Sequence, residues 1–291
     1  MKTHKNDAGK HPTQDEIARK MGVSATTVSQ WLQGKYLGDT GAIDTAAEQM
    51  LTRELERKAK PKVRLQFVKT RVASAVREVC KIAHLDGEIG VITGDAGLGK
   101  TEAVKDYAKN NEGVVLIEAD LGYSARNLFQ EIHRRIGLDG AGGIRKLFSD
   151  IVDKLSDTGW VIIVDEAEHL PYKALELIRR IHDKAGVGLV LVGMPRLIAN
   201  LRGKQGEYKQ LYSRVGVYRQ LDKLELADVE RLVVQVYPQA NGLCKCFLEC
   251  SDGNARMLTK LLARTVRLEA LNPDQGLSKE LIREARTTLI A

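Results

Sequence analysis

The octapeptide GDAGLGKT, residues 94–101, constrains the fold of this chain more than any other feature. It follows the apolar run IGVIT and precedes EAVKDYAKN, so it has the strand–loop–helix context of a G-x-x-x-x-G-K-[ST] phosphate loop. Glycines let successive backbone N–H groups point at phosphate oxygens, and the helix start adds its positive dipole end. The side chain of Lys100 is expected to reach the β- and γ-phosphates. The predicted nucleotide-binding residues are Gly94, Asp95, Ala96, Gly97, Leu98, Gly99, Lys100 and Thr101.

A second motif, GWVIIVDEAEHLP at 159–171, places acidic residues directly after an apolar run. A short run rich in β-branched residues favours a strand that is buried on both faces. Ligands of such sheets bind at the carboxyl ends of the strands, so we expect Asp165 beside a Mg²⁺ ion held by Thr101. Glu166 would polarise the water that attacks the γ-phosphate. These assignments predict an ATPase that uses ATP and Mg²⁺, against the plainer alternative of a strand that ends in a solvated turn.

Alternation of strands and helices defines the fold class. Short apolar runs alternate with helical patterns at 89–93, 113–119, 160–164 and 188–193. This order predicts an α/β fold with a parallel sheet covered by helices on both sides. The expected organisation is a helix-turn-helix domain with a linker helix at 1–60, an α/β core at 61–224, and a helical domain at 225–291.

Composition narrows the classes of partner. The chain has 291 residues, of which 43% are hydrophobic and 29% charged, as in ordinary soluble globular proteins. No apolar run approaches the roughly 20 residues of a membrane span, and the polar N-terminus is unlike a signal peptide. We therefore expect a cytoplasmic protein without a membrane partner. The net charge of +7 favours a polyanionic partner, although many basic proteins bind no nucleic acid.

The segment TQDEIARKMGVSATTVSQWLQGKY, residues 13–36, has the pattern of a helix-turn-helix. We expect helices at 14–21 and 25–33, joined by a turn in which Gly22 adopts a positive φ. No further packing helix is evident before residue 13, so the module is expected to be small and loosely tethered. The alternative is a helical hairpin that only packs against its neighbour. The polar side chains expected to face DNA are Ser24, Thr26, Thr27 and Gln30.

Taken in this order, GDAGLGKT, VIIVDEAEHL and the helix-turn-helix resemble the MuB family of bacteriophage DNA transposition proteins, which are AAA+ ATPases. The resemblance implies an AAA+ P-loop sheet with a helical C-terminal lid, preceded by a small all-α domain. It further implies ATP-dependent, largely sequence-nonspecific binding to double-stranded DNA and a homo-oligomeric filament on that DNA. Such a protein delivers target DNA to a transposase and activates it, in the cytoplasm of the bacterial host.

The resemblance also assigns roles to single positions. LYSRVG resembles the segment that presents an arginine finger to a neighbouring subunit, which makes Arg214 the candidate, and SDGNARMLTKLL resembles the start of the second sensor helix with Arg256. The chain departs from the family at Met194, where a polar first sensor such as Asn is expected; a thioether cannot orient water as an amide can. Arg126, in DLGYSARN, is a candidate DNA contact.

Two other functions remain open on the sequence. A helix-turn-helix regulator or replication initiator would use the nucleotide as a conformational switch and bind a defined operator. A small-molecule kinase shares the phosphate loop, but it leaves DEAEHL and the helical C-terminus unexplained.

Overall fold

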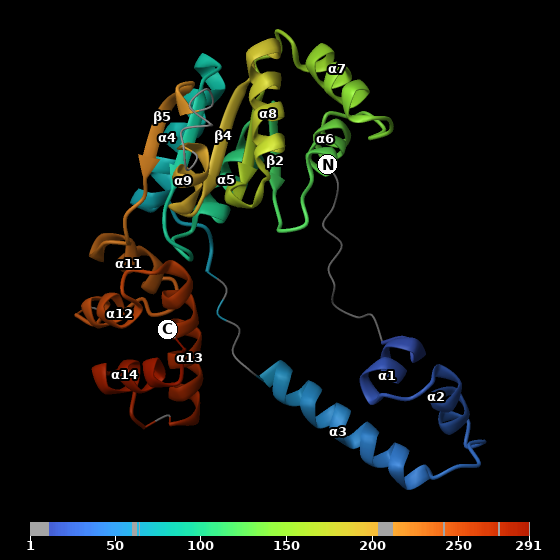
Figure 1. The fold of residues 1–291 in the computed structure, drawn as a ribbon. Helices are drawn as coiled ribbons and strands as arrows, with labels where there is room; N and C mark the ends of the chain where they lie inside the picture. The colour runs from blue at the N-terminus through green and yellow to red at the C-terminus, as the bar shows by residue number, and fades with distance from the viewer. Residues whose placement is uncertain are drawn as a thin grey trace. The chain divides into compact units, whose positions relative to one another are not determined.

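The computed structural model describes residues 12–59, 63, 65–202, 212–240, 242–272 and 274–290. The chain divides into two compact units, Met1–Lys62 and Val63–Ala291, which we describe separately (Figure 1).

In the part of the N-terminal unit that is described, the helices are α1 (Gln14–Met21), α2 (Ala25–Leu32) and α3 (Thr40–Ala59). Thr13 and Glu16 form a capping box at the start of α1. Among the residues of this unit whose burial is described, the buried ones are Ala18, Val28, Ile43 and Ala47. Helix α3 is joined to α2 by a 2.9 Å hydrogen bond from Trp31 Nε1 to Asp44 Oδ1. The expected two-helix module therefore gains a third packing helix, because α3 supplies the apolar surface that was not evident before residue 13.

The C-terminal unit is built on a parallel sheet with strand order β2-β3-β4-β1-β5. The strands are β1 (Ile89–Thr93), β2 (Val114–Glu118), β3 (Val161–Asp165), β4 (Gly188–Gly193) and β5 (Val215–Gln220). In register, Thr93 pairs with Gly193 and Glu118 pairs with Asp165. The carboxyl ends of these four strands therefore lie at the same edge of the sheet. The α/β class predicted from alternation is confirmed.

Helices cover both faces of this sheet (Figure 1). On one face pack α4 (Arg71–Asp86) and α5 (Lys100–Asn110). On the other pack α6 (Ala125–Arg135), α7 (Ile144–Leu155) and α8 (Tyr172–Ala185). Within β3, Ile163 belongs to the first core, and Ile162 and Val164 to the second. The strand is thus buried on both faces, as its apolar sequence predicts.

A helical region follows β5. It consists of α11 (Leu226–Val233), α12 (Cys244–Ser251), α13 (Ala255–Leu271) and α14 (Lys279–Thr287), which we call the lid. Buried lid residues such as Leu258 and Leu262 share one apolar core with α4 and α5. The segment that enters α4 is also attached to the lid. The backbone N–H of Gln66 donates to Gln235 Oε1 at 2.7 Å, and Gln235 Nε2 donates to the Gln66 carbonyl at 3.3 Å.

Strand β5 was not among the strands predicted from the sequence. Its sequence, VGVYRQ, contains no continuous apolar run, because β5 lies at the edge of the sheet and is largely exposed. Among the helices within the described ranges, none is both long and apolar enough to span a membrane.

Candidate nucleotide-binding site

Residues 94–99 form the loop between β1 and α5 that the sequence predicts to bind phosphate. Gly97 and Gly99 have φ angles of +83° and +96°, in the left-handed region that favours glycine. Gly99 precedes α5 as its N-cap and provides no side-chain hydrogen bond. The first N–H groups of α5 are therefore available to an anion at the positive end of the helix dipole.

Lys100 begins α5 with only 6% of its surface exposed. Its Nζ donates to the carbonyl oxygens of Gly94 at 2.7 Å and Asp95 at 2.9 Å. Burial lowers the pKa of the ammonium group, whereas the nearby carboxylates, first Glu166 and then Asp165, act in the opposite direction. The predicted lysine and the predicted acidic pair therefore lie close enough to interact electrostatically.

Asp165 ends β3 in a buried position. Burial raises the pKa of its carboxyl above the ordinary value, while hydrogen bonds from the Thr101 hydroxyl and the Glu166 N–H oppose that shift. Oδ1 accepts the Glu166 N–H at 3.0 Å, but Oδ2 has no hydrogen-bond partner among the residues described. A buried oxygen without a partner, next to a threonine hydroxyl, fits Mg²⁺, which prefers oxygen ligands in a small, strict geometry.

A cavity of about 610 Å³ opens at this edge of the sheet. Its lining includes Gly97, Lys100, Thr101, Glu118, Glu166 and Met194. Glu166 has a φ of +54°, a conformation that is uncommon outside glycine and is often found at functional sites. The volume lies within the range of small-molecule sites. Phosphate-loop groups and both carboxylate-bearing strands β2 and β3 thus meet around one space.

The lid forms another wall of the same cavity. Arg256, Thr259 and Lys260 of α13 line it, so two cations face the phosphate loop. The backbone N–H of Arg256 donates to the Gly97 carbonyl at 3.0 Å. Cationic side chains on this wall suit phosphate oxygens, with which they form charge-assisted hydrogen bonds.

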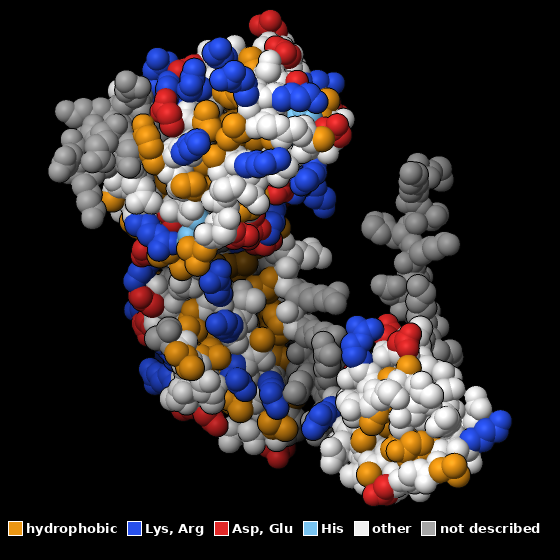
Figure 2. All heavy atoms as spheres, turned by 45° about the vertical axis from the view of Figure 1, so that its right-hand side comes forward, with side chains coloured by type: hydrophobic (Ala, Val, Ile, Leu, Met, Phe, Trp, Pro, Cys, Tyr) orange, Lys and Arg blue, Asp and Glu red, His pale blue; other side chains and the backbone are white. Residues whose placement is uncertain are grey.

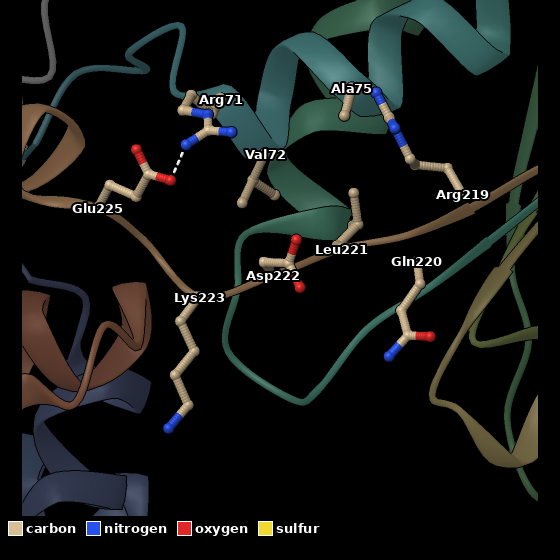
Figure 3. Close-up of a pocket in the computed structure, with 9 residues that line it drawn as sticks. All are labelled: Arg71, Val72, Ala75, Arg219, Gln220, Leu221, Asp222, Lys223 and Glu225. Atoms are coloured by element: carbon tan, nitrogen blue, oxygen red, sulfur yellow. Dashed lines mark ion pairs between the residues drawn. The ribbon is translucent and has the colours of Figure 1, made fainter.

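A smaller hollow of about 150 Å³ lies between the start of α4, the end of β5 and residues 221–225 (Figure 3). Figure 3 shows an ion pair at one side of it, between Arg71 and Glu225. The backbone N–H of Arg71 also donates to Asp228 Oδ1 of α11 at 2.9 Å. These two contacts join the first turn of α4 to the beginning of the lid.

Known proteins resemble this chain at the level of both domain and whole sequence. Residues 84–201 match the family model of an AAA domain. The Mu-like prophage FluMu DNA transposition protein B of Haemophilus influenzae is 29% identical over 272 residues, covering 90% of this chain and 94% of that protein. The ATP-dependent target DNA activator B of Escherichia phage Mu is 30% identical over 224 residues, covering 75% of this chain and 70% of that protein. The chain belongs to the target DNA activator B family.

A solved structure shares the fold of this family member. The Aeropyrum pernix ORC2 protein, in its ADPNP–ADP complexes, superposes with a TM-score of 0.58 at 17% identity, covering 78% of this chain and 70% of that chain. At that identity the likeness concerns the fold alone. The predicted fold class is confirmed: an AAA+ parallel sheet with a helical C-terminal lid, preceded by a small all-α helix-turn-helix. The predicted membership of the MuB-like family is confirmed as well.

Two positions singled out by that family resemblance lie at different distances from the cavity. Met194 follows β4 and lines it. Arg214 precedes β5 and does not line it; instead its Nη1 forms a 2.8 Å ion pair with Asp183 Oδ1 of α8, and 55% of its side chain is exposed. The candidate finger of this target DNA activator B homologue is therefore held on the surface, away from the phosphate loop of its own chain.

The residues predicted to contact DNA are largely exposed. In α2, Thr26 and Gln30 are exposed, whereas the Ser24 hydroxyl caps the helix by accepting the Thr27 N–H at 3.0 Å. Arg126 in α6 is exposed and donates to the Gly142 carbonyl at 3.3 Å. Figure 2 shows Lys and Arg side chains interspersed with acidic and apolar ones rather than gathered in a single patch. Charge on this face therefore does not by itself trace a path for DNA.

Sequence reasoning about this family member missed several residues at the site. Glu118 lines the cavity, and its signal was present as the acid near the end of GVVLIEA. Asn254 contacts the phosphate loop although 158 positions separate it from Ala96. Glu168 and His169 were visible in DEAEHL, but their contacts with the end of β4 and the start of α9 (Arg196–Arg202) depend on tertiary structure.

Proposed function

We propose that this chain is a DNA-stimulated AAA+ ATPase that binds DNA with little sequence preference, assembles on target DNA as a homo-oligomer, and delivers that DNA to a transposase, which it activates. One observation carries the proposal. The phosphate loop, Thr101 and Glu166 line a single cavity, and the buried Asp165 accepts a hydrogen bond from Thr101, in a chain whose relative in phage Mu is named an ATP-dependent target DNA activator. As for that class of protein, we place it in the cytoplasm of a bacterial host.

The residues of the cavity have chemical roles that suit ATP hydrolysis. Lys100 exchanges its contacts with two loop carbonyls for oxygens of the β- and γ-phosphates. Thr101 and Asp165 hold Mg²⁺, which when bound neutralises charge on the phosphates. Glu166 accepts the proton of the attacking water while the bond between the γ-phosphorus and the bridging oxygen breaks, leaving ADP and phosphate. Arg256 contacts the phosphates from the lid side.

Arg214 completes the site of a neighbouring subunit in this proposal. Its guanidinium is exposed and lies outside the cavity of its own chain. A guanidinium supplied in trans stabilises the charge of the transition state, so turnover becomes dependent on assembly. DNA stimulates hydrolysis because it is the surface on which subunits assemble.

DNA binding is assigned to two regions. Thr26 and Gln30, with the capping hydroxyl of Ser24 and the Thr27 hydroxyl bonded to it, present hydrogen-bonding groups at the start of α2 that suit phosphates and base edges. Arg126 offers a phosphate contact in the C-terminal unit. Contacts of this kind release counterions, so binding is expected to fall steeply with added salt.

A second function draws support from the N-terminal unit. Its α2 is capped by Ser24 and supported by α3, as in a helix that reads a defined operator. In that case the chain is a regulator or initiator, and ATP acts as a conformational switch. A discrete complex on one sequence, insensitive to salt, distinguishes this function from assembly on any DNA.

Electron microscopy and ATPase assays with a random-sequence duplex test the proposal. We expect ordered polymers when ATP is present and none without it, together with ATP turnover that rises on adding DNA. Glu166→Gln should keep nucleotide binding and polymers while abolishing turnover. Wild-type turnover by this variant would contradict the role of Glu166, and discrete complexes on a single sequence, without polymers, would favour the regulator.

A further inference from the structure

Met194, which follows β4, offers no polar side chain to the catalytic arrangement. The inference drawn from this rests on the proposed ATPase function. Met194 and Glu166 both line the cavity, and the Met194 thioether is at best a weak acceptor that cannot donate a hydrogen bond. A carboxylate that accepts a proton from water works only when its orientation is fixed. A polar group from elsewhere must therefore hold Glu166.

The turn after β3 brings His169 back towards Glu166. The left-handed backbone of Glu166 leads into the short 3-10 helix η1 (Ala167–His169), and the His169 N–H donates to the Glu166 carbonyl at 3.0 Å. As a result, His169 Nε2 lies 3.8 Å from Glu166 Oε2. The His169 side chain is only 18% exposed, so surrounding atoms restrict its position. A small rotation of either side chain brings the two atoms to hydrogen-bond distance.

His169 is braced from the side of β4 and α9. Arg196 Nη2 lies 3.4 Å from His169 Nε2 and 3.6 Å from Glu168 Oε1. Glu168 has a fully buried side chain, and its Oε1 accepts the Met194 N–H at 3.1 Å. The Asn200 side chain donates to the Glu168 carbonyl at 3.1 Å. These contacts connect Met194, which follows β4, to the turn that carries Glu166. The connection uses the backbone of Met194 and the charges of Glu168 and Arg196 rather than the Met194 side chain.

We propose that His169 is a positioning residue for Glu166 and takes the place of a polar side chain at the end of β4. Its Nε2 faces both Arg196 and Glu166. With the proton on Nδ1 the ring accepts from Arg196, and with the proton on Nε2 it donates to Glu166. The second arrangement fixes the carboxylate towards the γ-phosphate. Neither arrangement requires the ring to change its net charge.

A cation site is the main alternative for this cluster. Glu166, Glu168 and His169 offer ligand atoms that all lie within 4.8 Å of one another. The guanidinium of Arg196 already occupies their neighbourhood, at 3.6 Å from Glu168 and 3.4 Å from His169. A second cation would be repelled by that charge, and Glu168 Oε1 is engaged by the Met194 N–H. Arg196 and the Met194 N–H therefore already contact His169 and Glu168 without an added ion.

Steady-state ATP hydrolysis on DNA, measured with the full chain, tests the proposal. His169→Ala should lower kcat about 10- to 100-fold, the range in which orienting partners at metal sites act, with the KM for ATP unchanged. His169→Gln should recover most of the loss, because an amide both donates and accepts. Arg196→Gln should show a smaller loss. The matched control is Lys173→Ala, an exposed change near the same turn, which should match wild type.

A double variant separates positioning from folding. If His169 acts through Glu166, then adding His169→Ala to Glu166→Asp, which moves the carboxylate but should keep a measurable rate, should cost less in single-turnover cleavage than His169→Ala costs the wild type. Equal kcat for His169→Ala and wild type would overturn the inference and leave the ATPase intact. A rise in KM together with a lower melting temperature would also overturn it, since that pattern indicates a structural histidine. A wild-type chain without ATP turnover on any DNA would instead remove the proposed function and this inference with it.

Discussion

The side-chain amide of Asn254 donates to the carbonyl oxygen of Ala96 at 2.7 Å, and this bond joins the lid to the phosphate loop. The same side chain caps α13, because its Oδ1 accepts the Met257 N–H at 3.0 Å. One residue thus sets the start of the helix that carries Arg256 and the position of the loop that faces it. The position of the lid and the shape of the phosphate loop are therefore coupled.

Substitutions at Asn254 should separate these two roles. Asn254→Ser keeps a good N-cap but is too short to reach Ala96, whereas Asn254→Ala loses both contacts. We expect Asn254→Ala to cost about 1 kcal/mol of stability through the cap, and Asn254→Ser to cost little. Both should weaken ATP binding, measured by titration with a fluorescent analogue. Full affinity in Asn254→Ser would show that the bond to Ala96 does not matter for nucleotide binding.

A substitution at Gly97 tests the contact of Asn254 with the phosphate loop from the side of the loop. A Cβ at Gly97 would lie 2.5 Å from Asn254 Oδ1, whereas one at Gly137 would meet nothing within 4 Å. Their φ angles are similar, +83° and +85°, so each change to alanine carries a backbone strain of roughly 1–2 kcal/mol. Gly137→Ala should lower only the melting temperature. Gly97→Ala should lower it and also weaken ATP binding; equal affinities in the two variants would argue against a close approach of Asn254.

The sequence predicts the parts of this site that local chemistry specifies. The glycines of the phosphate loop, and an acidic pair after an apolar strand, each have a form that their own segment dictates. It does not predict contacts between distant segments. The Asn254–Ala96 bond depends on how the lid packs, and the approach of His169 to Glu166 depends on a left-handed residue within DEAEHL.

Strand β5 shows the same limit for the fold. A central strand such as β3 is recognisable because both of its faces are buried, so nearly every residue is apolar. An edge strand with one exposed face carries residues such as Arg219 and Gln220 and resembles a loop. The partner strand, rather than the local sequence, decides that these residues are extended.

Asp165 should oppose stability in the protein without ligand. Burial raises the pKa of its carboxyl, so between the ordinary and the raised pKa the folded chain binds more protons than the unfolded one. The stability that the protonated Asp165 carboxyl contributes is therefore fully present at lower pH. It is lost as pH rises through the pKa of this carboxyl in the folded state. At neutral pH we expect Asp165→Asn to raise the melting temperature by about 2–4 °C, the shift that ~1 kcal/mol gives in a domain of this size.

The Asp165→Asn variant should also lose the rise in melting temperature that Mg²⁺ adds to that of ATP alone. In the wild type, ATP with Mg²⁺ should raise the melting temperature more than ATP with EDTA, because Thr101 and Asp165 hold the ion. In Asp165→Asn this difference should disappear, and turnover with it. A variant that retains the Mg²⁺-dependent shift would contradict the role of Asp165 as a metal ligand, whereas a variant less stable than the wild type without ligand would contradict the cost assigned to its buried carboxylate.

If Arg214 acts in trans, mixtures of inactive variants should recover turnover when the subunits assemble. The side chain is paired with Asp183 of its own chain and lies outside its own cavity, so Arg214→Ala should remove turnover without removing ATP binding. Glu166→Gln should also lack turnover, yet it keeps Arg214. When the two variants are mixed on DNA, an Arg214→Ala subunit has an intact cavity and receives the guanidinium of a Glu166→Gln neighbour. Random mixing in equal amounts should restore up to about a quarter of wild-type turnover, since half of the cavities and half of the arginines are intact.

Mixing Lys100→Ala with Glu166→Gln is the matched control and should restore nothing, because both changes disable the cavity. No recovery in the first mixture, or wild-type turnover by Arg214→Ala alone, would show that this arginine is not supplied by a neighbour.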